Sequence, residues 1–101
     1  MARVIKYSGE ESVLVITGDP IVDAYMFASI VGGGLEVSEL SPMTCMLYNG
    51  ELSWDDEGVE KFANAKATRL LQKEYGIIMP LLGSVIIIDV EDLSSIMGLS
   101  P

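Results

Sequence analysis

The sequence predicts a single domain over residues 1–101, of the α+β or α/β class. Three observations support this class. Short β-branched runs recur along the chain, two longer segments have the apolar spacing of helices, and Gly, Pro or Asn-Gly separate them. We expect two layers: a mixed sheet of five to six short strands, packed against two main helices and a short C-terminal helix. A chain of this size buries about 60–68% of its unfolded surface, which suffices for one core.

The N-terminal region is expected to form a β-hairpin. Residues 3–8 and 12–17 are two β-rich runs, and the turn around Gly9 separates them. Residues 13–16 are all apolar, which is typical of a central strand covered on both faces.

The next segment, residues 20–31, is expected to be a helix. Asp19 is a favourable N-cap, and Pro20 at the first helical position loses no hydrogen bond. Almost every other residue of the segment is apolar, so the helix is either buried or in contact with another chain. Tyr25, Met26 and Phe27 are therefore our first interface candidates.

Residues 35–40 alternate between apolar and polar side chains and predict a strand. The order strand, helix, strand with short connections would permit a right-handed βαβ unit. Further along, residues 43–48 and 51–54 flank Asn49-Gly50, the preferred dipeptide of a two-residue hairpin turn, so we expect a second hairpin here.

The C-terminal half is expected to contain a long helix, a strand and a short helix. Residues 55–75 have an amphipathic helical pattern that ends at Gly76. Residues 85–90 resemble the strand expected at 13–16 and are expected to be buried. A short helix then opens at Asp89 or Glu91 and stops at Gly98.

The charges are strongly acidic and unevenly placed. Fifteen acids oppose six bases, and no base lies between Lys6 and Lys61, a stretch with eleven acids. This balance opposes binding to nucleic acid or to an anionic membrane surface. The N-terminus does not resemble a signal peptide, and no uncharged run reaches the length of a membrane span. We therefore predict a cytoplasmic protein with neither kind of partner.

Histidine is absent, which removes the usual general base near neutral pH and the commonest transition-metal ligand. We predict no cofactor and lean against an enzyme. Catalysis by carboxylates stays open as an alternative.

Two sets of carboxylates are candidate ligand sites. The first set is the acid cluster Asp55, Asp56, Glu57 and Glu60, which could hold a divalent cation or could cap a helix and complement its dipole. The second set is Asp19 and Asp89, which would meet at one edge of the sheet if their preceding strands ran parallel.

Two further groups of side chains are candidates for binding. Met43, Cys45 and Met46 are soft ligands for Cu(I), but core packing explains them better. Lys66, Arg69 and Lys73 form a basic stripe on the long helix, either solvated or docking onto an acidic protein surface.

Taken together, the pattern favours a small acidic protein-interaction or assembly domain without enzymatic activity. Half of the residues are hydrophobic, which is high for a small domain of net charge −9, and the helix at 20–31 offers an apolar surface. A homo-oligomer or a protein partner is expected. The alternatives are a regulatory domain that binds a small ligand or a divalent cation, and a carboxylate-based enzyme.

Overall fold

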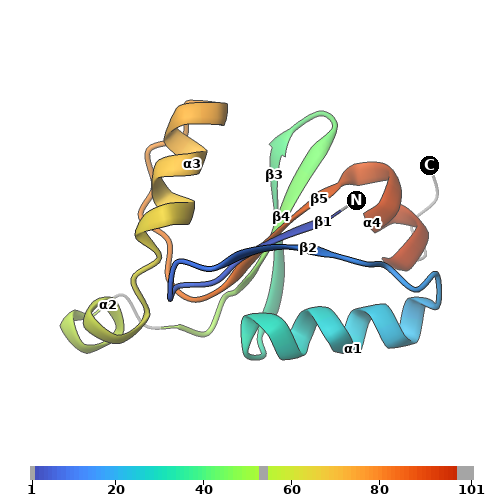
Figure 1. The fold of residues 1–101 in the computed structure, drawn as a ribbon, viewed down its shortest axis with the longest axis horizontal. Helices are drawn as coiled ribbons and strands as arrows, with labels where there is room; N and C mark the ends of the chain where they lie inside the picture. The colour runs from blue at the N-terminus through green and yellow to red at the C-terminus, as the bar shows by residue number, and fades with distance from the viewer. Residues whose placement is uncertain (1, 53–54, 98–101) are drawn as a thin grey trace.

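The computed structural model describes residues 2–52 and 55–97, with side chains up to residue 93, and has an α+β fold (Figure 1). Five strands form one sheet in the order β2-β1-β5-β4-β3. The strands are β1 (Ala2–Ile5), β2 (Glu11–Leu14), β3 (Leu35–Ser41), β4 (Thr44–Asn49) and β5 (Val85–Asp89). The helices are α1 (Pro20–Val31), α2 (Asp56–Phe62), α3 (Ala65–Tyr75) and α4 (Val90–Met97). The predicted class is confirmed, but each described pair of neighbouring strands is antiparallel, so the sheet is not mixed.

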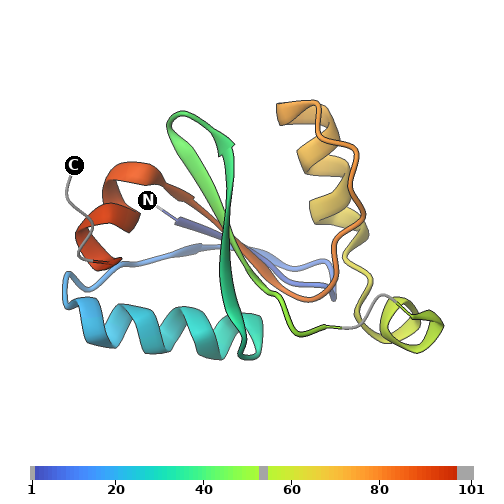
Figure 2. The same cartoon turned by 180° about the vertical axis from the view of Figure 1, so that it is seen from behind.

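Helices cover both faces of the sheet, so the domain has three layers where two were expected. The α1/α4 core packs Phe27, Val31 and Leu93 against one face of the sheet. The α3 core packs Ala67 and Leu71 against the other. In both views α1 and α4 lie together at one end of the molecule, and α2 and α3 lie at the opposite end (Figures 1 and 2).

Strand β5 is the centre of the sheet, as its sequence predicts. Residues 85–88 are all buried, because their alternating side chains enter the two cores in turn. The predicted hairpin of β1 and β2 is also confirmed. The prediction that residues 13–16 form a central strand is wrong, since β2 is an edge strand. Val13 and Val15 are 64% and 78% exposed, while Leu14 and Ile16 pack inward.

Helix α1 has the predicted bounds. Its N-cap is Asp19, whose Oδ1 accepts hydrogen bonds from the backbone N–H groups of Ile21 (2.9 Å) and Val22 (3.2 Å). It ends at Gly32, which adopts the left-handed conformation (φ 92°) that glycine reaches without strain. The strands on either side of α1 are β2 and β3, which lie at opposite edges of the sheet. A βαβ unit is therefore absent from this segment.

The expected hairpin around Asn49-Gly50 is wrong. The hairpin instead joins β3 to β4 through a turn at residues 42–43, and β4 pairs with β5 on its other side. With both edges of β4 occupied, a strand after Gly50 would have nowhere to pair. The Gly50 N–H donates to the Gly34 carbonyl (2.9 Å), and the side chain of Asn49 accepts from the Glu51 N–H. Residues 53–54 of the expected strand lie outside the described residues.

The single helix expected over residues 55–75 is two helices, α2 and α3, which meet at Asn64. Asn64 is buried, and its Nδ2 donates to the carbonyls of Ile5 (2.9 Å) and Gly83 (2.8 Å). Its Oδ1 accepts from the Ala67 N–H (3.0 Å) as the N-cap of α3. These long-range hydrogen bonds explain the break, because a continuous helix would not leave the Asn64 backbone free to pair with Leu81.

Within the part of the chain that the structure describes, no helix combines the length and apolar character needed to cross a membrane.

Candidate functional site

The distribution of charged residues divides the molecule into two parts, one that contains acids but no bases and one that contains both. The acidic part, residues 15–52 and 85–93, contains α1, β3, β4, β5 and the start of α4. It carries eight carboxylates and no base: Asp19, Asp23, Glu36, Glu39, Glu51, Asp89, Glu91 and Asp92. The mixed part, residues 2–14 and 55–84, carries the other seven carboxylates and all six bases. Almost all of the net charge of −9 therefore belongs to the acidic part.

Ion pairs join the elements of the mixed part. Glu11 on β2 contacts Arg3 (2.7 Å from Oε1 to Nη2) and Lys66 on α3 (3.2 Å from Oε2 to Nζ). The hydrogen bonds from Arg3 and Lys66 lower the pKa of Glu11, and their charges add to the effect. Of the predicted basic stripe, Lys66 is thus engaged within the chain. Arg69 and Lys73 are exposed, and neither has an ion pair among the described residues.

The outward surface of α1, here called the α1 face, consists of Ile21, Val22, Tyr25 and Ser29. It has no charged side chain, and Ile21 and Tyr25 are 70% and 76% exposed. The ring of Tyr25 is therefore largely in contact with solvent. Met26 is half-buried against the α1/α4 core. Phe27 is fully buried in that core, which corrects its prediction as an interface residue.

The only charged residue within α1, Asp23, is turned inward and fully buried. Its Oδ1 accepts from the backbone N–H (2.9 Å) and hydroxyl (2.7 Å) of Thr17, and its Oδ2 accepts from the Gly18 N–H (3.1 Å). Burial alone would raise the pKa of Asp23, but these three hydrogen bonds outweigh it and hold the pKa below its ordinary value. Asp23 thus fastens the Thr17-Gly18 turn to α1 and leaves the α1 face free of charge.

The two predicted ligand residues, Asp19 and Asp89, follow strands that point the same way. β2 and β5 are both antiparallel to β1, which lies between them, so their C-terminal ends lie at the same end of the sheet. Asp89 is the last residue of β5, and Asp19 belongs to the connection that follows β2. The carboxylate of Asp19 is occupied as the α1 cap. Across the described residues, no group of three or more Cys, Asp or Glu side chains is placed to hold a metal ion.

The acid cluster at residues 55–60 has the local roles of a helix start. Asp55 accepts from the Gly58 N–H (2.8 Å) as the N-cap of α2, and Glu57 pairs with Lys61 (2.8 Å) one turn later. Asp56 and Glu60 are exposed. The carboxylates therefore complement the helix dipole, and the geometry gives no support to a shared cation.

The sulfur-containing residues of β4 and its turn are separated. Cys45 is buried in the α1/α4 core, while Met46 is buried in the α3 core on the opposite face of the sheet. Met43 is exposed in the turn. Burial raises the pKa of the Cys45 thiol, with a smaller contribution from the charge of Glu39. Core packing of Cys45 and Met46 is confirmed, and a low-pKa thiol nucleophile finds no support here.

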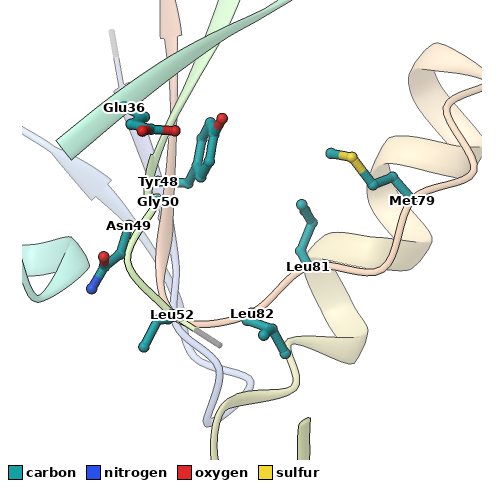
Figure 3. Close-up of a pocket in the computed structure, with 8 residues that line it drawn as sticks. All are labelled: Glu36, Tyr48, Asn49, Gly50, Leu52, Met79, Leu81 and Leu82. Atoms are coloured by element: carbon teal, nitrogen blue, oxygen red, sulfur yellow. The ribbon is translucent and has the colours of Figure 1, made fainter. Parts of the chain in front are cut away.

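A pocket of about 260 Å³ lies between the β3–β4 pair and the segment that leads into β5 (Figure 3). Its lining residues are Glu36, Tyr48, Asn49, Gly50, Leu52, Met79, Leu81 and Leu82. Glu36 and Tyr48 are directly opposite each other across the two strands. Burial raises the pKa of Tyr48, and a hydrogen bond with Glu36 and the charge of Glu36 raise it further. The phenol therefore stays protonated beside the carboxylate.

This pocket and the buried Asn64 were both missed at the level of sequence. The pairing of Glu36 with Tyr48 depends on the β3–β4 register, which the misplaced Asn49-Gly50 hairpin would not produce. Comparisons do not supply a function either: the chain matches no protein-family model, no curated protein and no solved structure. Function is thus inferred from the α1 face and the pocket.

Proposed function

We propose that the domain functions by protein association rather than catalysis, with a second copy of itself as the first partner. The contact surface is the α1 face. The observation that carries the proposal is the placement of charge: within a part of the molecule that holds eight acids and no base, the outward side of α1 presents only Ile21, Val22, Tyr25 and Ser29.

An uncharged surface suits association because charged side chains are costly to remove from water. Protein interfaces are depleted in charge at their centres and enriched in tyrosine, which buries a large ring while its hydroxyl keeps a hydrogen-bond partner. Tyr25 is the most exposed hydrophobic residue of the α1 face and lies one helical turn after Ile21. It is the residue we expect to contribute most to the contact.

A second copy fits this surface because both partners would then bury the same uncharged face around a two-fold axis. Bringing two acidic parts together produces repulsion, so the dimer is expected to be weak at low ionic strength and stronger when salt screens the charge. With its single cysteine buried, the domain suits the reducing cytoplasm, where we place it.

Size-exclusion chromatography with light scattering tests the proposal at about 50 μM protein in about 0.5 M NaCl, which screens the repulsion between the acidic parts. The wild-type chain should elute as a dimer, and Tyr25→Asp should weaken the dimer by about tenfold or more, as expected for a central aromatic contact. Ile78→Asp is the matched control. Ile78 is 85% exposed and lies on the segment after α3, so this variant adds the same charge away from the α1 face.

Equal dissociation by Tyr25→Asp and Ile78→Asp would show that the α1 face is not the contact. The proposal that the domain associates at all would be contradicted by two results together. The wild-type chain would be monomeric, and it would bind no protein partner whose binding Tyr25→Asp weakens. Unchanged melting temperatures of both variants confirm that folding is intact, which is expected because both residues are exposed.

A further inference from the structure

We propose that the pocket beside Glu36 binds a small organic cation, in the form of an ammonium group attached to a short apolar chain. The residues that carry this inference combine one carboxylate and one phenol with an apolar wall, as Figure 3 shows. The inference is independent of the proposed dimer, because none of the residues of the α1 face lines the pocket.

The sign of the ligand charge follows from the residues around the pocket. None of its described lining residues is basic, and no ion pair of Glu36 is found among the described side chains. Glu36 belongs to the acidic part, whose residues include eight acids and neither Lys nor Arg. An anion would therefore be repelled, whereas a cation would gain the charge of Glu36 and the field of its neighbours.

The position of Glu36 is limited by two neighbours. Tyr48 lies directly opposite Glu36 across the β3–β4 pair, and Figure 3 shows its ring beside the carboxylate. Gly50 leaves room on the other side, because a Cβ built on Gly50 would collide with the carboxylate of Glu36. The carboxylate is thus kept beside the ring of Tyr48, whose π-face attracts cations.

The wall of the pocket opposite Glu36 indicates the chemical character of the uncharged part of the ligand. Leu52, Met79, Leu81 and Leu82 line it, and Met79 reaches towards Tyr48 in Figure 3. These side chains suit an apolar body. A bare divalent metal ion is disfavoured, because Ca²⁺ needs six or more oxygen ligands and the described lining residues supply a single carboxylate. The volume of about 260 Å³ lies below the range of drug-sized sites, which limits the ligand to a small molecule.

Titration with n-butylammonium chloride, followed by NMR of ¹³C-methyl-labelled methionine, tests this proposal. The Met79 methyl signal should shift and saturate in the millimolar range, since so small a ligand has limited binding energy. The Met43 methyl, which is exposed outside the pocket, should not move and serves as the internal control. Sodium butyrate and 1-butanol, which share the apolar chain without the positive charge, should bind at least about tenfold more weakly.

Three variants locate the site. Glu36→Gln should weaken butylammonium binding by about tenfold or more, since it removes the charge while preserving the shape. Glu39→Gln is the matched control, because Glu39 is an exposed glutamate on the same strand that does not line the pocket, and it should leave the affinity within about twofold. Gly50→Ala should weaken binding with the charge retained, since it displaces Glu36.

Equal losses in Glu36→Gln and Glu39→Gln, or parallel shifts of the Met43 and Met79 methyls, would show general attraction to an acidic chain and would overturn the proposal. Equal binding of butanol, or no saturable shift of Met79, would overturn it as well. Unchanged methyl signals of the buried Met46 in the free variants confirm that each variant folds normally.

Discussion

The two parts of the molecule are stabilised in different ways. In the mixed part, Arg3, Glu11 and Lys66 connect β1, β2 and α3 through ion pairs on the surface. None of the six bases of the sequence belongs to the acidic part. There, Asp19 and Asp23 accept hydrogen bonds from backbone N–H groups and from the Thr17 hydroxyl. Burial and hydrogen bonds to the backbone therefore stabilise the acidic part. Its excess of negative charge makes two copies of the chain repel each other.

This difference explains why the uncharged α1 face is informative. A negatively charged surface keeps an acidic protein apart from its copies, and the acidic part has seven carboxylates besides the buried Asp23. The inward turn of Asp23 removes the one charge that α1 could have presented. In the mixed part, by contrast, acids and bases largely balance, so an uncharged face there would be less informative.

The largest expected effect concerns the interior of the mixed part. Asn64→Ala removes two hydrogen bonds to buried carbonyls and the N-cap of α3, and should lower the free energy of unfolding by about 3–4 kcal/mol. Urea denaturation followed by circular dichroism measures this change. Asn49→Ala is the control, because the hydrogen bond between its side chain and the Glu51 N–H is exposed, and it should cost less than about 1 kcal/mol. Similar losses in both variants would contradict the role of Asn64.

The second effect concerns the interior of the acidic part. Asp23→Asn should lower the melting temperature at neutral pH, because the ionised carboxylate accepts three hydrogen bonds. Since the pKa of Asp23 is lowered by folding, its stabilisation is present above the ordinary carboxyl pKa of about 4 and is lost as pH falls through the folded value. The difference in melting temperature between wild type and Asp23→Asn should therefore shrink below about pH 4.

Asp56→Asn is the control for this pH series, because Asp56 is an exposed residue at the start of α2. Its melting temperature should stay close to that of the wild type at every pH, because an exposed charge at a helix start contributes at most about 1 kcal/mol. A difference in melting temperature between wild type and Asp23→Asn that stays constant with pH would contradict this prediction. It would mean that the amide fits the site less well than the carboxyl group, and that ionisation of Asp23 contributes nothing.

The smallest effect is expected at the surface of the mixed part. Glu11→Gln breaks the ion pairs with Arg3 and Lys66, but these side chains are partly exposed and surface pairs are weak. The melting temperature should fall slightly at low salt, and the difference should vanish at about 1 M NaCl, where screening is nearly complete. A large loss that persists at high salt would mean that the mixed part depends on these pairs.

The sequence predicts those elements whose signals are local. Asp19, Pro20 and Gly32 mark the ends of α1, and the observed bounds agree with them. The apolar run at 85–88 correctly predicts a buried strand. The similar run at 13–16 misleads, because periodicity cannot show whether a strand has neighbours on both sides. Strand order decides that, and it places β2 at an edge.

The features that were missed depend on contacts between distant residues. Asn64 interrupts a helical pattern because it bonds to Ile5 and Gly83, which lie far away in the sequence. The turn preference of Asn49-Gly50 is overridden by the pairing of β4 with β5. Of the candidate site, the exposure of Tyr25 agrees with the sequence-based expectation, while the burial of Phe27 contradicts it.

The central claim is that copies of the chain associate through the uncharged α1 face despite the charge of the acidic part. Sedimentation equilibrium of the wild type and of Tyr25→Asp, between about 0.05 and about 0.5 M NaCl, tests it most directly. The account predicts that the wild-type mass rises with salt from 10.9 kDa towards twice that value, while Tyr25→Asp stays near the monomer mass. A wild-type monomer at every salt concentration would contradict the account. Association that weakens as salt rises would also contradict it, and would indicate charge-driven docking through Arg69 and Lys73.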